Sequence, residues 1–346
     1  MEDARMTFDI YGLKIDIISD WKDLINAIEK DFSYFKTQKS LNKSAGITVE
    51  VSNENRSIDS YPEMEAVFST PRNVCYYKDD ISYIDYFGKG LTIYDRGKQA
   101  LNLYSDDIYI AHEGLYQAIL SLAGEYLDKK RFHRIHGLGI QKDGKALIIM
   151  LDSGSGKTEL ALKFLRSDQH DYRLISEDTP LMSCREGVQP FPLRLGIKDA
   201  EKAADFPEDM KVYFPRIEFC PKYLVDILHF KDRLADSRSK PWILISGKRS
   251  TFKEPRIVAI SKLSLMRDVF KNLIMGLGVY QGMEFMLKKS PFDILKKSGV
   301  VWSRFITAAV LVLKAKTFRI VLSKDSDKNY TFLCDFIEEQ HRGLSN

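Results

Sequence analysis

The sequence predicts an α/β protein in two parts. Residues 1–128 contain several segments in which apolar and polar residues alternate, which predicts an N-terminal α+β module. Residues 129–346 alternate apolar strands with amphipathic helices. Within this second part, the continuously apolar run 145–151 has the pattern of a strand buried on both faces, and a glycine-rich turn and a helix follow it directly. These observations predict an α/β domain over 129–346.

Strands are expected to dominate the N-terminal part. A hairpin is predicted over 7–17, with its turn at Gly12. Period-two alternation predicts further strands at 46–51, 81–86 and 91–94. Apolar residues at helical spacing predict helices over 21–35 and 113–127.

The second part continues the alternation of strands and helices. After the buried strand, a helix is predicted over 158–165 and a strand over 172–176. Further strands are predicted at 241–246 and 317–322. Further helices are predicted at 262–275, 301–314 and 329–340.

The composition is that of an ordinary globular protein. Hydrophobic residues make up 44% and charged residues 29% of the 346 residues, and the net charge is only +4. Because acids and bases are interspersed, the charge does not predict a nucleic-acid partner. The four cysteines are far apart and form no CxxC pair, so neither a disulfide framework nor a zinc site is predicted. They are Cys75, Cys184, Cys220 and Cys334.

The sequence also predicts a cytoplasmic protein with no membrane partner. Its charged start has no apolar run behind it, so no signal peptide is expected. The longest apolar stretch near the C-terminus, 306–313, is too short to span a bilayer. Cysteines without a pairing pattern fit a reducing compartment.

The turn after the buried strand carries a phosphate-loop motif. Residues 151–158 match the pattern GxxxxGK[ST] except at the first position, where Leu151 replaces glycine. Gly154 and Gly156 allow the backbone to curl so that successive N–H groups form an anion nest, and the following helix directs its positive end at the same point. The alternative is a glycine-rich turn with an incidental lysine.

The residues after these glycines predict the ligand. Lys157 can reach the β- and γ-phosphates of a nucleotide, and the Thr158 hydroxyl can hold Mg²⁺. The expected cofactors are therefore ATP and Mg²⁺. The predicted ATP-binding residues are Asp152, Ser153, Gly154, Ser155, Gly156, Lys157 and Thr158.

Two acids follow the next predicted strand. Glu177 and Asp178 come directly after 172–176, far enough from Thr158 to allow a helix, a loop and a returning strand. A phosphate-loop kinase needs such an acid to organise Mg²⁺ or to activate the acceptor. Thr158, Glu177 and Asp178 are therefore the predicted metal ligands. The alternative is a solvated turn, because a proline follows closely.

One histidine precedes the buried strand. His136 can contact a transferred phosphoryl group or take a proton, although a structural role is also open. His133, three positions earlier, has no stronger claim. The remaining histidines form no constellation and are expected to be structural; they are His112, His170, His229 and His341.

Together these residues resemble the catalytic domain of the HPr kinase/phosphorylase family, a P-loop kinase fold related to PEP carboxykinase. The family pattern is a histidine–glycine pair, a glycine-rich SGxGKS loop, a helix, and a strand that ends in two aspartates. His136 with Gly137, the loop, and Glu177 with Asp178 follow that order and rough spacing. The resemblance covers about residues 130–200 well and the rest of the second part loosely. It implies an HPr-kinase-like P-loop catalytic domain.

The resemblance implies a role for each matched residue. Lys157 and the loop amides bind the phosphates of ATP, and Thr158 ligates Mg²⁺. Asp178 is the base that takes the proton from an acceptor serine hydroxyl, and His136 assists near the phosphate. Glu177 stands where the family has its first aspartate. The implied activity is transfer of the γ-phosphoryl group of ATP to a hydroxyl, of a serine in a protein or peptide or of free serine.

The resemblance also implies a catalytic arginine. The family places one in a mobile loop in the region after the strand 241–246. Arg249 could stabilise charge on the moving phosphoryl group, while a solvated basic turn fits equally well. Arg194 is a second candidate for the same role.

Two departures from the family pattern keep a second class of function open. Leu151 replaces the first loop glycine, and no acid stands near 192–196, where the family has a further metal ligand. A nucleotide-binding regulator or peptide-binding module with a degenerate kinase site is therefore the alternative. The N-terminal module is expected to recognise the substrate or a partner. A homo-oligomer is also open, because relatives of this kinase form assemblies.

Overall fold

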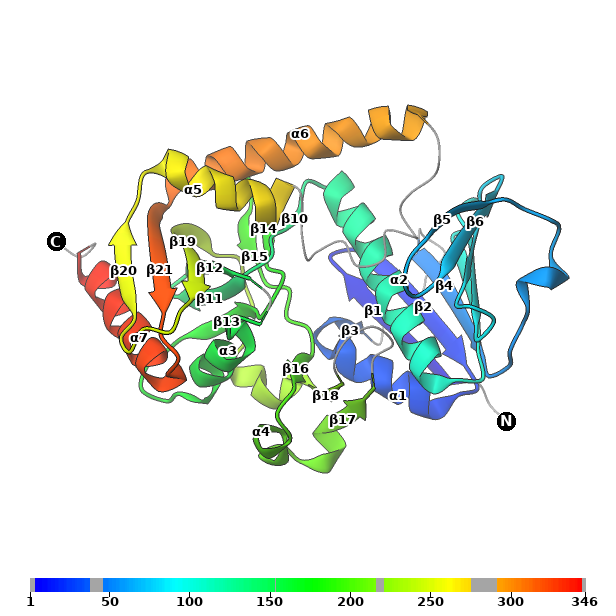
Figure 1. Ribbon diagram of the computed structural model, residues 1–346, viewed down its shortest axis with the longest axis horizontal. Helices are drawn as coiled ribbons and strands as arrows, with labels where there is room; N and C mark the ends of the chain where they lie inside the picture. The colour runs from blue at the N-terminus through cyan, green and yellow to red at the C-terminus, as the bar shows by residue number, and fades with distance from the viewer. Residues whose placement is uncertain (1–3, 38–45, 153, 216–220, 275–290, 344–346) are drawn as a thin grey trace. The chain divides into compact units, whose positions relative to one another are not determined.

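The computed structural model describes residues 4–37, 46–152, 154–215, 221–274 and 291–343 (Figure 1). The chain forms two units. Unit 1 comprises Met1–Lys130, Leu193–His229 and Tyr280–Lys297. Unit 2 comprises Arg131–Pro192, Phe230–Val279 and Ser298–Asn346. Both units combine helices with sheets, so the chain is a mixed α/β protein as the sequence predicted.

Unit 1 is built on a nine-stranded mixed sheet. In order across the sheet, the strands are β3 (Lys36–Thr37), β1 (Ala4–Ile10), β2 (Leu13–Ser19), β4 (Gly46–Ser52), β9 (Ala100–Tyr104), β8 (Leu91–Asp95), β7 (Ile81–Asp85), β6 (Val74–Lys78) and β5 (Ala66–Ser69). The β2–β4 and β4–β9 pairs are parallel. The predicted hairpin is confirmed: Tyr11 and Gly12 take positive φ values of 53° and 92°, which a tight two-residue turn requires.

Two helices pack with this sheet. Helix α1 (Lys22–Asp31) ends four residues before the predicted end at residue 35, and a short 3₁₀ turn, η1 (Ser33–Phe35), completes the segment. Helix α2 (Ile108–Lys129) begins five residues before the predicted start at residue 113. The earlier start has a local cause, because the Asp107 side chain accepts hydrogen bonds from the N–H groups of Tyr109 and Ile110.

The segment 193–229 lies within the second part predicted from the sequence, but in the structure it belongs to unit 1. It forms a small antiparallel sheet and helical turns. These are β16 (Leu195–Ile197), α4 (Ala200–Ala204), η3 (Glu208–Met210), β17 (Lys211–Phe214) and β18 (Lys222–Val225). The division at residue 128 therefore fails for this segment. The sequence gives no sign that the chain re-enters unit 1 here, because the strands of this segment are short and show no strong alternation of apolar and polar residues.

Unit 2 is built on a six-stranded mixed sheet. In order, its strands are β13 (Arg173–Ser176), β11 (Leu138–Lys142), β12 (Lys145–Leu151), β19 (Lys240–Arg249), β21 (Lys316–Leu322) and β20 (Arg256–Ala259). The central strands β12, β19 and β21 are parallel, so their carboxyl ends meet at one edge of the sheet. The antiparallel strand β11 lies between β12 and β13.

Helices cover both faces of this sheet (Figure 1). Helix α5 (Lys262–Val269) and the part of α6 (Pro291–Lys314) that belongs to unit 2 lie along one side, and α3 (Lys157–Arg166) and α7 (Ser326–Arg342) lie along the other. Alternate residues of β12, including Ile148 and Met150, pack with apolar residues of α5 and α6. This two-sided burial is what the continuously apolar sequence of β12 predicted.

The predicted helix 262–275 changes type part-way along. Its α-helical part ends at Val269, and a π-helical turn, η5 (Phe270–Ile274), follows; Met275 lies outside the described residues. A small sheet of β10 (His133–Arg134), β14 (Leu181–Ser183) and β15 (Gly187–Gln189) completes unit 2.

Two further findings concern the chain as a whole. In the part that the structure describes, no helix combines the length and apolar character needed to cross a bilayer. Cys75, Cys184 and Cys334 are free thiols, and Cys220 lies outside the described residues.

Candidate functional site

The site is centred on the loop between β12 and α3. Gly154 and Gly156 have φ values of 79° and 98°, in the left-handed region that glycine adopts without steric cost. The Ser155 N–H donates to the Asp152 carbonyl at 3.1 Å, which closes the turn. Gly156 is the N-cap of α3, so the unpaired N–H groups of the first helical turn face the same side as the loop. Ser153, a predicted ATP-binding residue, lies outside the described residues.

The Lys157 ammonium group is the buried cation of this loop. Its side chain is only 7% exposed. Nζ donates to the Leu151 carbonyl at 2.9 Å and lies 2.9 Å from Nε2 of His136. It also lies 3.6 Å from a carboxylate oxygen of Asp178. The structure thus brings together three residues that the sequence analysis selected from three separate segments.

The contacts of His136 fix its tautomer. An ammonium group can only donate, so Nε2, 2.9 Å from Lys157, must accept. The proton of a neutral ring is therefore on Nδ1, which faces the Asp178 carboxylate at 3.2 Å. Backbone bonds hold this arrangement. The His136 N–H donates to the Asn272 carbonyl at 3.1 Å, and the Gly137 N–H donates to the Asp178 carbonyl at 2.9 Å.

Gly137 is a position where the backbone approaches closely. A Cβ atom there would lie 2.9 Å from the carbonyl oxygen of Ile149 on β12. Only glycine therefore allows the His136 segment to lie against the phosphate-loop strand. This gives the histidine–glycine pair a local physical reason.

Asp178 is ionised in this environment. Its partial burial opposes ionisation, but the hydrogen bond from His136 and the positive charge of Lys157 outweigh that effect and hold the pKa of Asp178 below its ordinary value. The side chain is 41% exposed, so an acceptor molecule can reach it.

Thr158 and Glu177 meet beside the loop. The Thr158 hydroxyl donates to a carboxylate oxygen of Glu177 at 2.6 Å. Adjacent oxygens in an octahedral Mg²⁺ shell lie about 3 Å apart, so this pair needs only a small opening to bind the ion. No group of three or more His, Cys, Asp or Glu side chains suited to a metal occurs among the described residues. Proteins usually hold Mg²⁺ with one or two carboxylates, together with water and phosphate oxygens.

Arg249 reaches the loop from the end of β19. Because β12 and β19 are parallel and Leu151 is paired with Gly247, both strands end at the same edge. The Arg249 guanidinium donates to the Glu159 carboxylate at 3.4 Å and to the Lys324 carbonyl at 2.8 Å. A Cβ atom on Gly156 would lie 3.3 Å from it. The first arginine candidate is therefore beside the phosphate loop.

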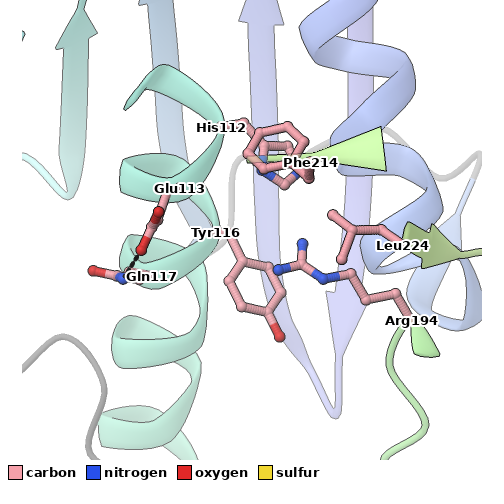
Figure 2. A pocket seen from close by; sticks show the side chains of 7 residues that line it. All are labelled: His112, Glu113, Tyr116, Gln117, Arg194, Phe214 and Leu224. Carbon is pink, nitrogen blue, oxygen red and sulfur yellow. Dashed lines mark hydrogen bonds between the residues drawn. The ribbon is translucent and has the colours of Figure 1, made fainter. Parts of the chain in front are cut away.

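Arg194, the second arginine candidate, has a different environment. It belongs to unit 1, where its guanidinium forms an ion pair with Asp31 and stacks 3.6 Å from the centre of the Tyr116 ring (Figure 2). His112 lies 2.8 Å from the same carboxylate. These contacts engage the guanidinium inside unit 1, so the catalytic interpretation of Arg194 is replaced by a structural one.

The hollow beside Arg194 is too small for a substrate. Figure 2 shows its lining, which includes Glu113 and Gln117 from α2 and Phe214 from β17. Its volume is about 10 Å³, which is close to the space of one water molecule. We therefore place the candidate site at the phosphate loop.

One further side chain at the loop was not predicted from the sequence. Nζ of Lys271, on the π-helical turn η5, lies 2.8 Å from the Asp152 carboxylate. Lys271 lies far along the chain from the loop, in a segment predicted as an ordinary helix. Its sequence context carries no signal for a site.

Comparison with known proteins adds no assignment: no family model matches the chain, and no curated protein matches it significantly.

Proposed function

We propose that the chain is an ATP-dependent phosphotransferase whose unit 2 is an HPr-kinase-like P-loop domain. It transfers the γ-phosphoryl group to a hydroxyl, of a serine in a protein or peptide or of free serine. One observation carries the proposal. The Lys157 ammonium, the His136 ring and the Asp178 carboxylate form one contact cluster at a glycine loop that caps a helix.

Phosphate binding follows from the loop. The glycine turn and the first turn of α3 offer N–H donors, and Lys157 adds a positive charge. Thr158 and Glu177 would hold Mg²⁺, which neutralises phosphate charge when bound. Arg249, beside the loop, stabilises charge that develops on the transferring group.

Asp178 is positioned to receive the proton of the acceptor. The acceptor oxygen forms a bond to the γ-phosphorus, the bond from that phosphorus to the bridging oxygen breaks, and ADP leaves. The acceptor proton passes to Asp178 and then to solvent, which the 41% exposure of this side chain allows. Since the pKa of Asp178 is low, its main contribution is to orient the hydroxyl, as expected for a loose transition state.

His136 acts through its neighbours. Its Nδ1 proton faces Asp178 and its Nε2 faces Lys157, so the ring fixes the positions of the carboxylate and the ammonium group relative to each other. If Lys157 turns toward phosphate oxygens, one positive charge leaves Asp178. The carboxylate then becomes a better proton acceptor.

The test is transfer of radiolabelled phosphate from ATP to free serine, threonine and serine-containing peptides. We expect Asp178→Asn to lower kcat by about 10²–10⁴-fold. The matched control is Asp171→Asn, which removes an exposed acid near the start of the same strand. Identical turnover by wild type and Asp178→Asn with the true acceptor would contradict the proposed base.

A second candidate function is a nucleotide-binding regulator. Leu151 at the first loop position and the lack of an acid at 192–196, where the family has a further metal ligand, favour it. It predicts nucleotide binding without phosphate transfer to any acceptor. In both cases we propose unit 1 as the module that recognises the substrate or partner.

A further inference from the structure

The phosphate loop has a second lysine, supplied by the turn η5. Nζ of Lys271 donates to the Asp152 carboxylate at 2.8 Å, and Asp152 is a loop residue. About half of the Lys271 side chain and two thirds of the Asp152 side chain are exposed. An ammonium group has three donors, and this carboxylate is the one partner that the described residues give it.

The backbone of η5 holds Lys271 in place. The carbonyl of the next residue, Asn272, accepts the His136 N–H at 3.1 Å. The Leu273 side chain is fully buried, and its carbonyl accepts a hydrogen bond from Arg304 at 2.9 Å. Lys271 therefore projects from a turn anchored to the His136 segment and to the core. π-Helical turns are frequent at functional sites.

Lys271 completes a pattern around the loop. Lys157 pairs with Asp178 and Arg249 pairs with Glu159, so each of these cations already faces a carboxylate. Lys271 pairs with Asp152 in the same way. The pKa of Asp152 also reflects the cations around it. The hydrogen bond from Lys271 is the main cause that lowers the pKa of this acid, burial opposes it, and the charges of Lys271 and Lys157 add to the lowering.

A carboxylate at the mouth of a phosphate site repels a polyphosphate unless it is neutralised. Asp152 holds this position, directly before the glycine turn. Lys271 neutralises it and retains two N–H donors for oxygen acceptors. An ammonium group with two unused N–H donors at this point can bind a phosphate chain that extends beyond the N-terminus of α3.

We propose that Lys271 is a phosphate-binding residue that makes the site select nucleoside di- and triphosphates over monophosphates. The inference rests on the proposed function, because it assigns a further residue to the same nucleotide site. It names two roles for one side chain: neutralising Asp152 and donating hydrogen bonds to the phosphate chain.

The test measures nucleotide binding by calorimetry on the full chain with Mg²⁺. We expect Lys271→Ala to weaken binding of ATP and ADP about tenfold, which is the effect of one lost charged hydrogen bond, and to leave AMP binding unchanged. Lys271→Arg should retain most of the affinity. The control is Lys314→Ala. It removes an exposed lysine at the end of α6, just before β21, where the parallel strands begin and not where they end at the phosphate loop. This variant should bind ATP like wild type.

Asp152→Asn separates the two roles. If Lys271 binds phosphate itself, Asp152→Asn/Lys271→Ala should still bind ATP about tenfold more weakly than Asp152→Asn. Equal affinity of these two variants would show that Lys271 only neutralises Asp152, and would overturn the inference. Equal affinity of Lys271→Ala and Lys314→Ala would overturn it too, while leaving the nucleotide site intact. Failure of the wild type to bind any nucleotide would overturn both the inference and the proposed function.

Discussion

Removing the charge of the buried Asp31 carboxylate is expected to destabilise unit 1. It lies at the end of α1, and its side chain is 1% exposed. The guanidinium of Arg194 and Nε2 of His112, the latter at 2.8 Å, both face it. Asp31→Asn keeps the shape of the side chain but removes the carboxylate charge with which the buried Arg194 guanidinium is paired.

The structure allows the size of this effect to be worked out by comparison. Removing one partner of a buried ion pair costs about 3–5 kcal/mol, because the remaining charge stays buried. The same helix offers a matched exposed pair, Glu29 with Lys36 at 2.6 Å, whose side chains are 37% and 47% exposed. An exposed pair of this kind contributes at most about 1 kcal/mol.

The assay is urea denaturation of the full chain, followed by circular dichroism, with thermal unfolding as a second readout. We expect Asp31→Asn to lower the free energy of unfolding of unit 1 by about 3 kcal/mol or more, and its melting temperature by about 2–4 °C for each kcal/mol. Glu29→Gln should change it by less than about 1 kcal/mol. If the two variants lose the same stability, the interpretation of Asp31 and Arg194 as a buried ion pair is wrong.

Three further predictions concern pH, metal and packing. Burial raises the pKa of Asp31, but Arg194 and His112 lower it more, to below the ordinary 3.8. The unfolded state therefore binds this proton more readily than the folded state does. As the pH falls from about 5 to 3, the unfolding free energy of wild type should decrease more steeply than that of Asp31→Asn, measured by urea denaturation at each pH. Thr158→Val removes the oxygen bonded to Glu177 and should raise the Mg²⁺ concentration needed for half-maximal turnover about tenfold, whereas Thr158→Ser should not. Gly247→Ala places a Cβ atom 2.6 Å from the Leu151 side chain and should cost about 1–3 kcal/mol in thermal unfolding, whereas Gly299→Ala, in open space on a helix, should not destabilise.

The parts of the fold that depend on local sequence patterns could be predicted. The apolar run of β12 and the glycine turn after it are short-range signals, and the structure contains both as expected. The contact between Thr158 and Glu177 could also be predicted, because β13 returns toward the loop and ends at the same edge of the sheet as β12.

Other features depend on long-range contacts that no local pattern reports. The strand β11 lies between β12 and β13, so the acids reach the loop from two strands away. Arg194 appeared as a candidate catalytic group because its partner Asp31 lies far away in the sequence. Lys271 was missed because only the π-helical turn and its bond to Asp152 bring it to the loop.

The central claim is that the loop after β12 binds nucleotide phosphates through Lys157. Calorimetric titration of Mg²⁺ and ATP into wild type, Lys157→Ala and Lys163→Ala tests it most directly. Lys163 is the control, because it lies on the same helix and pairs with Asp327. We predict that wild type and Lys163→Ala bind ATP alike and that Lys157→Ala binds it at least about tenfold more weakly. Unchanged ATP affinity in Lys157→Ala would contradict the claim.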